Sequence, residues 1–316
     1  MNDDLMSRAA REFGISFGDL ARPDNARSGA GVHRARTHDG LAVYLKLTPA
    51  RLGIGMLEGA RRELSFYRRL ADQVPVSTPP LLGALDTDDG VALLLAAAGK
   101  QVNVEAWSGQ AWAALGRDLA GLHAFPEAGQ DRSGQDRSGH DSLLTAMSEP
   151  VSDEVTEFWG EVLPELPELL ASRDAMRAEL AAQPAVFIHG DCHTGNIVHG
   201  PDGLVFCDWP SAGPGRATAD LAHLSVRATP AGVAIPREMM TAYLDGCGGE
   251  AADLEQALVP AELAVFLFQW PPYAVYNSQA GIERVHYRTR LLARKWLGMV
   301  TRQRGLKRRA RRRNLG

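Results

Sequence analysis

One segment of this 316-residue chain constrains its fold more than any other. Residues 189–196 read His-Gly-Asp-Cys-His-Thr-Gly-Asn, and the pair Asp208-Trp209 follows twelve positions later. The apolar runs at 185–188 and 204–207 predict two short buried strands, and Pro201-Asp202-Gly203 predicts a turn between them. The acidic residues therefore belong at strand ends, joined by a loop and a hairpin. Rigid elements of this kind hold catalytic groups at a fixed separation, as catalysis by positioning requires.

The residue types in this segment suit phosphoryl transfer from ATP. That reaction needs a group that accepts the proton of the attacking hydroxyl, and hard oxygen ligands for Mg²⁺. Asp191 supplies the first, and Asn196 and Asp208 supply the second. The segment thus predicts a kinase-type catalytic loop followed by a metal-binding carboxylate.

The spacing also resembles a known superfamily. The Asp-to-Asn interval is that of the protein-kinase signature, but Gly190 stands in place of Arg and Trp209-Pro210 in place of Phe-Gly. Gly213, Gly215 and then Asp220-Leu221-Ala222 continue the pattern. Together these residues resemble the aminoglycoside phosphotransferase and choline kinase superfamily, the small-molecule relatives of protein kinases.

The resemblance implies an α+β, bilobal protein-kinase-like fold. Residues 1–98 would form a small antiparallel-sheet N-lobe with one main helix, and 99–301 a larger, mainly helical C-lobe. We expect the C-lobe helices near 110–124, 150–182, 216–227, 236–246, 251–271 and 280–303. The basic tail, 302–316, is expected to be disordered.

A kinase needs a lysine for the α- and β-phosphates and a glutamate that orients it. Lys46 ends a β-rich run, 41–47, and a lysine inside an apolar strand is costly unless its charge is paired. Glu63 lies centrally on the helix predicted at 57–71, so the resemblance pairs it with Lys46. The competing carboxylate is Glu58, near the helix start, where it could serve only the helix dipole. A solvated strand-end lysine and a surface glutamate remain the structural alternative.

Two further nucleotide contacts follow from order along the chain. Ser28, Gly29 and Gly31 occupy the place of a phosphate-covering glycine loop, although the third glycine of the kinase pattern is absent and a plain hairpin turn also explains them. Residues 95–98 leave a strong predicted strand, and the resemblance makes Leu95 and Ala97 part of a hinge that meets adenine.

The resemblance assigns supporting roles and a reaction. His189 would pack and hydrogen-bond the catalytic loop, and Asp220 would brace it from behind. ATP and Mg²⁺ are the implied cofactors, with ATP against GTP left open. No Ala-Pro-Glu segment follows Asp208, so we expect activity without activation-loop phosphorylation and favour a small hydroxylated substrate over a protein.

Composition fits a globular protein with an uneven charge. Hydrophobic residues make up 45% of the chain, and no stretch is long and apolar enough to span a bilayer. The formal net charge is −4, yet 302–316 holds eight Lys or Arg and no acid, so the rest carries −12. An acidic body suits a cationic substrate, and nucleic acid is expected to bind, if at all, only through the tail. The N-terminus lacks signal-peptide features, and three cysteines are too few for a disulfide framework, which together favour the cytoplasm.

Several alternatives stay open. An aminoglycoside or other antibiotic is the favoured substrate, with choline-like, homoserine-like or sugar alcohols behind it. A nucleotide-binding pseudoenzyme acting through its tail is the alternative from another class, and a transition-metal hydrolase using His189, His193 and His199 is a weaker one. Aromatic residues between 266 and 276 could wall a substrate site, the repeat at 130–139 predicts a surface loop, and the oligomeric state is not indicated.

Overall fold

The computed structural model describes residues 5–15, 31–126 and 142–313, and divides the chain into two compact units. Unit 1 comprises Met1–Val102 and Gly195–Ala212, and unit 2 comprises Asn103–Thr194 and Gly213–Gly316. Unit 1 contains an antiparallel sheet and unit 2 is mainly helical, so the predicted α+β class with a sheet unit and a helical unit is confirmed. Residues 195–212, which the sequence-based division kept in the second lobe, pack with unit 1.

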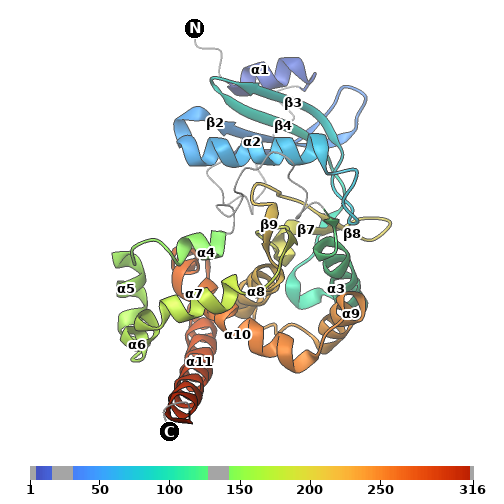
Figure 1. Ribbon diagram of the computed structural model, residues 1–316. Coiled ribbons are helices and arrows are strands. Elements are labelled where there is room, and N and C mark those ends of the chain that lie inside the picture. The colour runs from blue at the N-terminus through green and yellow to red at the C-terminus, as the bar shows by residue number, and fades with distance from the viewer. Residues whose placement is uncertain (1–4, 16–30, 127–141, 314–316) are drawn as a thin grey trace. The chain divides into compact units, whose positions relative to one another are not determined.

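The main sheet of unit 1 has four antiparallel strands in the order β1-β2-β4-β3 (Figure 1). They are β1 (Gly31–Arg36), β2 (Ala42–Pro49), β3 (Leu81–Thr87) and β4 (Gly90–Ala96). The central strand β4 is apolar and buried from Gly90 to Leu95, as its continuous hydrophobic run predicts.

Two helices cover the two faces of this sheet, α1 (Leu5–Glu12) and α2 (Ile54–Arg69) (Figure 1). Side chains alternate between the faces of a strand. Val43, Leu45 and Leu47 of β2 therefore share one face, where they form a core with α1. The intervening residue, Lys46, belongs to the opposite face, which α2 covers. Because side chains alternate between the faces of β2, Lys46 faces α2.

A second, three-stranded sheet completes unit 1 in the order β5-β7-β8. It consists of β5 (Lys100–Gln101), β7 (Ile197–His199) and β8 (Leu204–Phe206). The predicted turn at 201–203 joins β7 to β8, and Gly200 N–H donates to the Gly203 carbonyl at 2.8 Å. Phe206 N–H also donates to the Ser77 carbonyl at 2.8 Å, which fastens the hairpin to the earlier part of unit 1. These bonds explain why residues 195–212 belong there.

Unit 2 is built from helices and one two-stranded sheet. The strands are β6 (Ala185–Ile188) and β9 (Gly213–Arg216), which pair antiparallel. The helices are α3 (Gly109–His123), α4 (Ser142–Ala146), α5 (Asp153–Gly160), α6 (Leu166–Ala171), α7 (Arg173–Ala181), α8 (Ala217–Ala228), α9 (Arg237–Cys247), α10 (Ala251–Phe268) and α11 (Gln279–Arg313). Single 3₁₀ turns occur at Ala50–Leu52, Val104–Ala106, Thr194–Asn196, Thr229–Ala231 and Pro271–Tyr276.

The core of unit 2 gathers around large aromatic side chains. Trp159, Trp270, Trp296 and Phe266 are each at most 1% exposed and belong to one hydrophobic cluster. The Trp296 indole N–H donates to Ser172 Oγ at 2.9 Å, so this buried ring keeps a polar partner. Packing of α8 against α10 and of α10 against α11 places α8 beside this core.

One expected helix and the expected tail differ from the structure. The single helix expected over 150–182 is three, because Pro164 and Pro167 interrupt it: α5 ends at Gly160, and α6 carries a proline in its first turn. The tail expected to be disordered is helical through Arg313, since Arg, Lys, Leu, Gln and Ala extend a helix that α11 has already begun.

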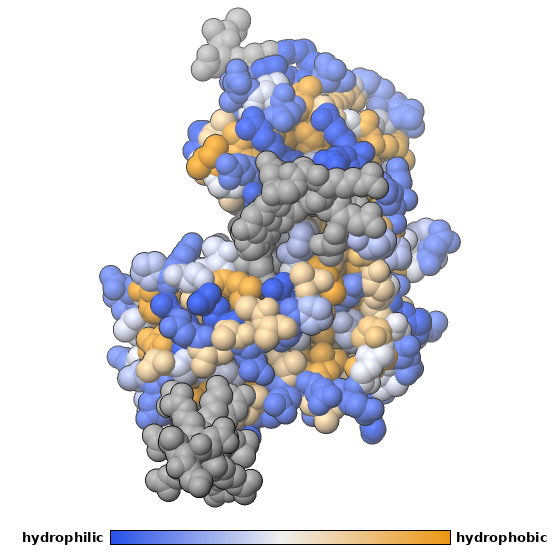
Figure 2. Space-filling view, in the orientation of Figure 1, coloured by the Kyte–Doolittle hydropathy of each residue, from blue (hydrophilic) through white to orange (hydrophobic). Residues whose placement is uncertain are grey.

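Within the described residues, no helix is long and apolar enough to cross a membrane. Figure 2 shows hydrophilic residues over much of the visible surface, with hydrophobic residues in separate patches. The cysteines are all free thiols: Cys192 is buried, Cys207 partly exposed and Cys247 exposed.

Candidate active site

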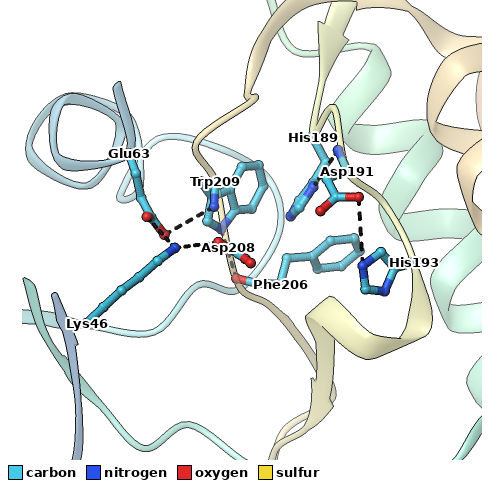
Figure 3. Close-up of polar contacts among 8 residues, drawn as sticks. All are labelled: Lys46, Glu63, His189, Asp191, His193, Phe206, Asp208 and Trp209. Carbon is cyan, nitrogen blue, oxygen red and sulfur yellow. Dashed lines mark hydrogen bonds and ion pairs between the residues drawn. The ribbon is translucent and has the colours of Figure 1, made fainter. Parts of the chain in front are cut away.

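Lys46 is the centre of a charged cluster in unit 1 (Figure 3). Its Nζ lies 2.5 Å from Glu63 Oε2 and forms a second ion pair with Asp208 Oδ1. The lysine side chain is 14% exposed and that of Glu63 only 1%. Glu58, the competing carboxylate, is exposed on α2. The structure therefore brings together Lys46, Glu63 and Asp208, from a strand, a helix and the end of a hairpin.

The charges in this cluster are strongly coupled. Burial opposes the positive charge of Lys46, but the carboxylates of Asp208 and Glu63 outweigh it and raise the pKa of the amine. Burial in turn raises the pKa of Glu63, against the opposing effect of the Lys46 charge. The amine therefore stays protonated at neutral pH. One lysine facing two carboxylates leaves an excess of negative charge, which suits a divalent cation.

Glu63 also holds the segment that carries Asp208. Its second oxygen, Oε1, accepts a hydrogen bond from Trp209 N–H at 3.3 Å. The Trp209 ring is fully buried and stacks on Phe66 of α2, with centroids 4.1 Å apart and planes 11° from parallel. Its indole N–H donates to the Phe206 carbonyl at 2.9 Å. The Trp that replaces the kinase Phe thus fixes this segment against α2 by one polar and one aromatic contact.

The β7–β8 hairpin sets Asn196 near the segment of Asp208. Ile197 pairs with Phe206, and Cys207 N–H donates to the Asn196 carbonyl at 2.8 Å, so Asn196 and Cys207 lie opposite each other. Asp208 follows at once, with φ of 68°, the only positive φ at a non-glycine among the described residues. Asp tolerates this left-handed conformation better than most residues, at some cost in strain. The turn of the backbone directs the carboxylate to Lys46.

Asn196 and Asp208 fit a Mg²⁺ site by their chemistry. Both offer hard oxygen atoms, and Mg²⁺ usually takes only one or two protein carboxylates and keeps waters and substrate phosphates as its other ligands. No group of three or more His, Cys, Asp or Glu residues suited to a metal occurs in the described part of the chain. A dedicated protein cage, such as the transition-metal hydrolase alternative needs, is therefore lacking in that part.

Asp191 lies in unit 2, in the loop that follows β6. Gly190, directly before it, has φ of 83°, a conformation that glycine adopts without strain and arginine would not. Asp191 N–H donates to Nδ1 of the fully buried His189 at 3.3 Å, so Nδ1 is the unprotonated ring nitrogen. The Asp191 side chain is 37% exposed, and its Oδ1 lies 3.7 Å from His193 Nε2 (Figure 3). The carboxylate is thus accessible, while its backbone is fixed.

Asp220, in the first turn of α8, is buried and hydrogen-bonds the backbone of this loop. It is completely buried, and its two oxygens accept the backbone N–H groups of His189 and Gly190, each at 2.8 Å. His123 Nε2 lies 3.3 Å from the same carboxylate, and Tyr243 OH lies 2.9 Å from His123 Nδ1. Burial would raise the pKa of Asp220, but the hydrogen bond and charge of His123, together with His189, outweigh it and lower the pKa. The carboxylate is ionised at neutral pH.

His123 and Tyr243 were not singled out by the sequence, although a signal for His123 was present. His123 falls four residues after Leu119 and eight after Leu115, on the buried face of α3. A histidine on such a face needs a polar partner. No comparable pattern marks Tyr243, because its partner is 120 residues away.

The remaining predicted site residues are placed as follows. Ser28 and Gly29 lie outside the described residues, and Gly31 begins β1, paired with Leu47. Leu95 is buried in β4 opposite Tyr44. Ala97 N–H donates to the Ala42 carbonyl at 3.0 Å, so this amide is engaged within the sheet.

Neither Cys192 nor Cys207 lies in an environment that favours a reactive thiolate. Burial and the nearby charges of Asp220 and Asp191 raise the pKa of Cys192. Burial, with the charges of Asp208 and Glu63, raises the pKa of Cys207 to about 12. Both thiols are therefore protonated at neutral pH, as filler residues would be.

The aromatic stretch divides between the core and the surface. Phe266 and Trp270 belong to the core of unit 2, Tyr273 is half-buried beneath the guanidinium of Arg227, and Tyr276 is exposed. Within the stretch that could wall a substrate site, Trp270 is only 1% exposed.

Solved structures resemble this chain in fold at low sequence identity. An amicoumacin kinase in complex with AMP-PNP, Ca²⁺ and its antibiotic shares 16% identity, with 92% of each chain covered and a TM-score of 0.65. An aminoglycoside phosphotransferase from Streptomyces rimosus, bound to ADP and streptomycin, shares 22% over 83% of this chain and 99% of that one, with a TM-score of 0.55. A choline kinase from Cryptosporidium parvum shares 11% over 95% and 94%, with a TM-score of 0.60.

A search of curated protein sequences finds no match. The model of a family described as "Phosphotransferase enzyme family" matches residues 26–256, well over half of the chain, and this range includes Lys46, Glu63, Asp191, Asp208 and Asp220.

Proposed function

The chain belongs to the phosphotransferase enzyme family and is a small-molecule kinase, and on that premise we propose that it transfers the γ-phosphoryl group of ATP to an alcohol with the aid of Mg²⁺. The observation that carries the proposal is the cluster of Lys46, Glu63 and Asp208 in unit 1. A buried, protonated lysine suits phosphate, and the excess carboxylate charge beside it suits the cation that accompanies ATP.

Each residue then has a distinct task. Asp191 accepts the proton of the substrate hydroxyl, and the carboxylate of Asp220 keeps the backbone of that loop in place. Lys46 binds the α- and β-phosphates, and Glu63 holds both Lys46 and the segment of Asp208. Asn196 and Asp208 would hold Mg²⁺, which supplies neutralisation of the phosphate charge when bound.

We further propose an antibiotic as the acceptor, an aminoglycoside or another hydroxylated compound. The resemblance to kinases whose structures contain amicoumacin and streptomycin supports this class. A metabolite alcohol is the second candidate, supported by the resemblance in fold to a choline kinase. A pseudoenzyme is less well supported, because the Lys, Glu, Asp, Asn and Asp set is complete. ATP as donor and three free thiols suit a reducing, ATP-containing compartment.

An ATP-consumption screen tests the proposal. The full chain is incubated with ATP and Mg²⁺ and with aminoglycosides, peptide antibiotics, macrolides, choline, homoserine and sugars, and each product mass is recorded. The proposal predicts a mass gain of one phosphoryl group on at least one acceptor. Acceptor-independent ATP binding without transfer to any compound would favour the pseudoenzyme instead.

A further inference from the structure

Arg227 lies in the last turn of α8, close to the loop that carries the candidate base. Its guanidinium carbon is 4.3 Å from the centre of the Tyr273 ring, and its Nη2 is 3.5 Å from His193 Nε2. The same His193 nitrogen lies 3.7 Å from Asp191 Oδ1. All four residues belong to unit 2. One side chain, His193, therefore separates the Arg227 guanidinium from the carboxylate of Asp191, which is proposed to accept the hydroxyl proton.

Within the described part of the chain, no acidic side chain forms an ion pair with Arg227. Arg227 is half-buried, and among the described residues no carboxylate oxygen lies within 4.0 Å of it. Arg288, also in unit 2, shows the usual arrangement: Glu262 accepts its N–H groups at 2.8 and 3.2 Å. A partly desolvated guanidinium with only an aromatic ring and an imidazole beside it has donors left for an anion.

A purely structural role predicts something different. Arg227 also neighbours the C-terminal end of α8, where a cation interacts favourably with the helix dipole, and its stacking on Tyr273 adds a cation–π contact. If Arg227 had only these two roles, substituting it would lower the stability of the fold. Neither explains why this cation lies next to His193, the neighbour of Asp191, in the part of unit 2 where the acceptor hydroxyl is proposed to bind.

We propose that Arg227, with His193 beside it, forms an acceptor subsite for a carboxylate. The acceptor would then carry a carboxylate near the hydroxyl that is phosphorylated, since the planar fork of arginine matches the two carboxylate oxygens. This inference rests on the proposed function for the identity of the hydroxyl site. Among the antibiotics and metabolite alcohols proposed above, it favours those that contain a hydroxy acid over aminoglycosides and choline-like alcohols, whose charges are all positive.

Direct binding tests the subsite without requiring any turnover. The Nε–H signals of ¹⁵N-arginine-labelled full-length protein are recorded at constant ionic strength, and that of Arg227 is assigned by its loss in Arg227→Lys. Two pairs of probes are titrated: D-glycerate against glycerol, and D-gluconate against sorbitol. The proposal predicts that at least one acid shifts the Arg227 signal saturably, while the matching alcohols do not. An unmoved signal with both acids, or equal shifts with acid and alcohol, overturns it.

Kinetics on the best acceptor of the screen give the second test. Arg227→Met is compared with Arg284→Met, an exposed arginine of α11 that bonds the Pro230 carbonyl. Loss of a charge-assisted hydrogen bond predicts a rise of about 10- to 100-fold in acceptor KM for Arg227→Met. The KM for ATP should not change, Arg227→Lys should recover part of the affinity, and Arg284→Met should behave as wild type.

The outcomes of the two tests separate the proposals. A rise in the KM for ATP in place of the acceptor KM would assign Arg227 to the transferred phosphoryl group and overturn the acceptor subsite. An unchanged acceptor KM would overturn it as well. A saturable shift of the Arg227 signal with an acid, without phosphoryl transfer to any compound, would support the carboxylate subsite and contradict the proposed kinase activity.

Discussion

At the residue scale, the site depends on a few buried charges that share partners. Glu63 is the clearest case, because one oxygen meets Lys46 and the other meets the Trp209 amide. Removing one partner of a buried ion pair leaves the other charge uncompensated, which typically costs about 3–5 kcal/mol. The residues of this cluster therefore serve folding and nucleotide binding together, and single variants must be read against a stability measurement.

The two proposed metal ligands should not be equivalent. Asp208→Ala removes an anionic ligand, so we expect it to abolish the dependence of ATP binding on Mg²⁺. Asn196→Ala should be milder, since Mg²⁺ readily keeps water in place of a neutral amide. Isothermal titration of nucleotide with and without Mg²⁺ measures both effects. Asp202→Ala, an exposed carboxylate in the turn of the same hairpin, is the matched control. A far greater loss in Asn196→Ala than in Asp208→Ala would mean that the roles are exchanged.

Local sequence carried much of this information at the residue level. Asp191, Asn196 and Asp208 could be recognised because phosphoryl transfer needs those residue types, whereas Lys46 and Glu63 were paired through the resemblance to the kinase superfamily. The second bond of Glu63 and the stacking of Trp209 on Phe66 could not. They join residues more than 140 positions apart, and such contacts leave no periodicity in the chain.

At the element scale, strands and the ends of helices position the side chains of the candidate active site. The alternation of β2 aims Lys46 at α2, the β7–β8 register sets Asn196 opposite Cys207, and α8 presents Asp220 to the loop after β6. The apolar runs predicted the strands at 185–188 and 204–206 because their burial is encoded locally. The strands at 197–199 and 213–216 were not predicted. The first, Ile-Val-His, is too short to show a pattern, and the second, Gly-Pro-Gly-Arg, has no apolar run, so only their pairing with β8 and β6 identifies them.

The contact of Asp220 with its loop makes stability depend on pH. The pKa of this carboxyl is lowered by folding, so its contribution is present above its unfolded pKa of about 3.9 and is lost as the pH falls through the lower folded value. Asp220→Asn, which leaves amides imperfectly paired in a buried site, should cost about 2–4 kcal/mol at pH 7.

Denaturant titrations between about pH 3 and pH 7 check this, with the exposed Asp245→Asn of α9 as control. The difference in the free energy of unfolding between wild type and Asp220→Asn should be constant above about pH 5 and become smaller below about pH 4. A gap that stays constant throughout would show that the Asp220 carboxyl is not the ionised acceptor of the two amides.

At the scale of the whole molecule, fold and substrate are encoded at different levels. Relatives at 11–22% identity share the fold, so the pattern of buried residues tolerates wide substitution. In our proposal, substrate choice depends on individual side chains such as the half-buried Arg227, which the sequence analysis did not single out. The basic end is a separate case: among the α11 side chains that the structure describes, which end at Arg302, the last in the core are Met299 and Val300.

Deleting 302–316 should therefore leave turnover within a few-fold of the full chain. If the tail binds nucleic acid, its eight cations could contribute a slope of up to about seven in log affinity against log salt, which the deletion would flatten. Steady-state kinetics and a salt titration on both chains measure the two effects. A collapse of turnover on truncation would show that this end of α11 is required by the catalytic fold.

The claim that Asp191 is the proton acceptor of an ATP-dependent transfer is tested most directly by a single-turnover measurement. Wild type and Asp191→Asn are each mixed with limiting ATP, saturating Mg²⁺ and the best acceptor, and phosphorylated product is quantified by mass with time. Loss of a general base typically lowers the rate by about 10²- to 10⁴-fold, while the affinity for ATP should be nearly unchanged because the proposed role of Asp191 is to contact the acceptor hydroxyl. Phosphorylation by Asp191→Asn at close to the wild-type rate would contradict the account.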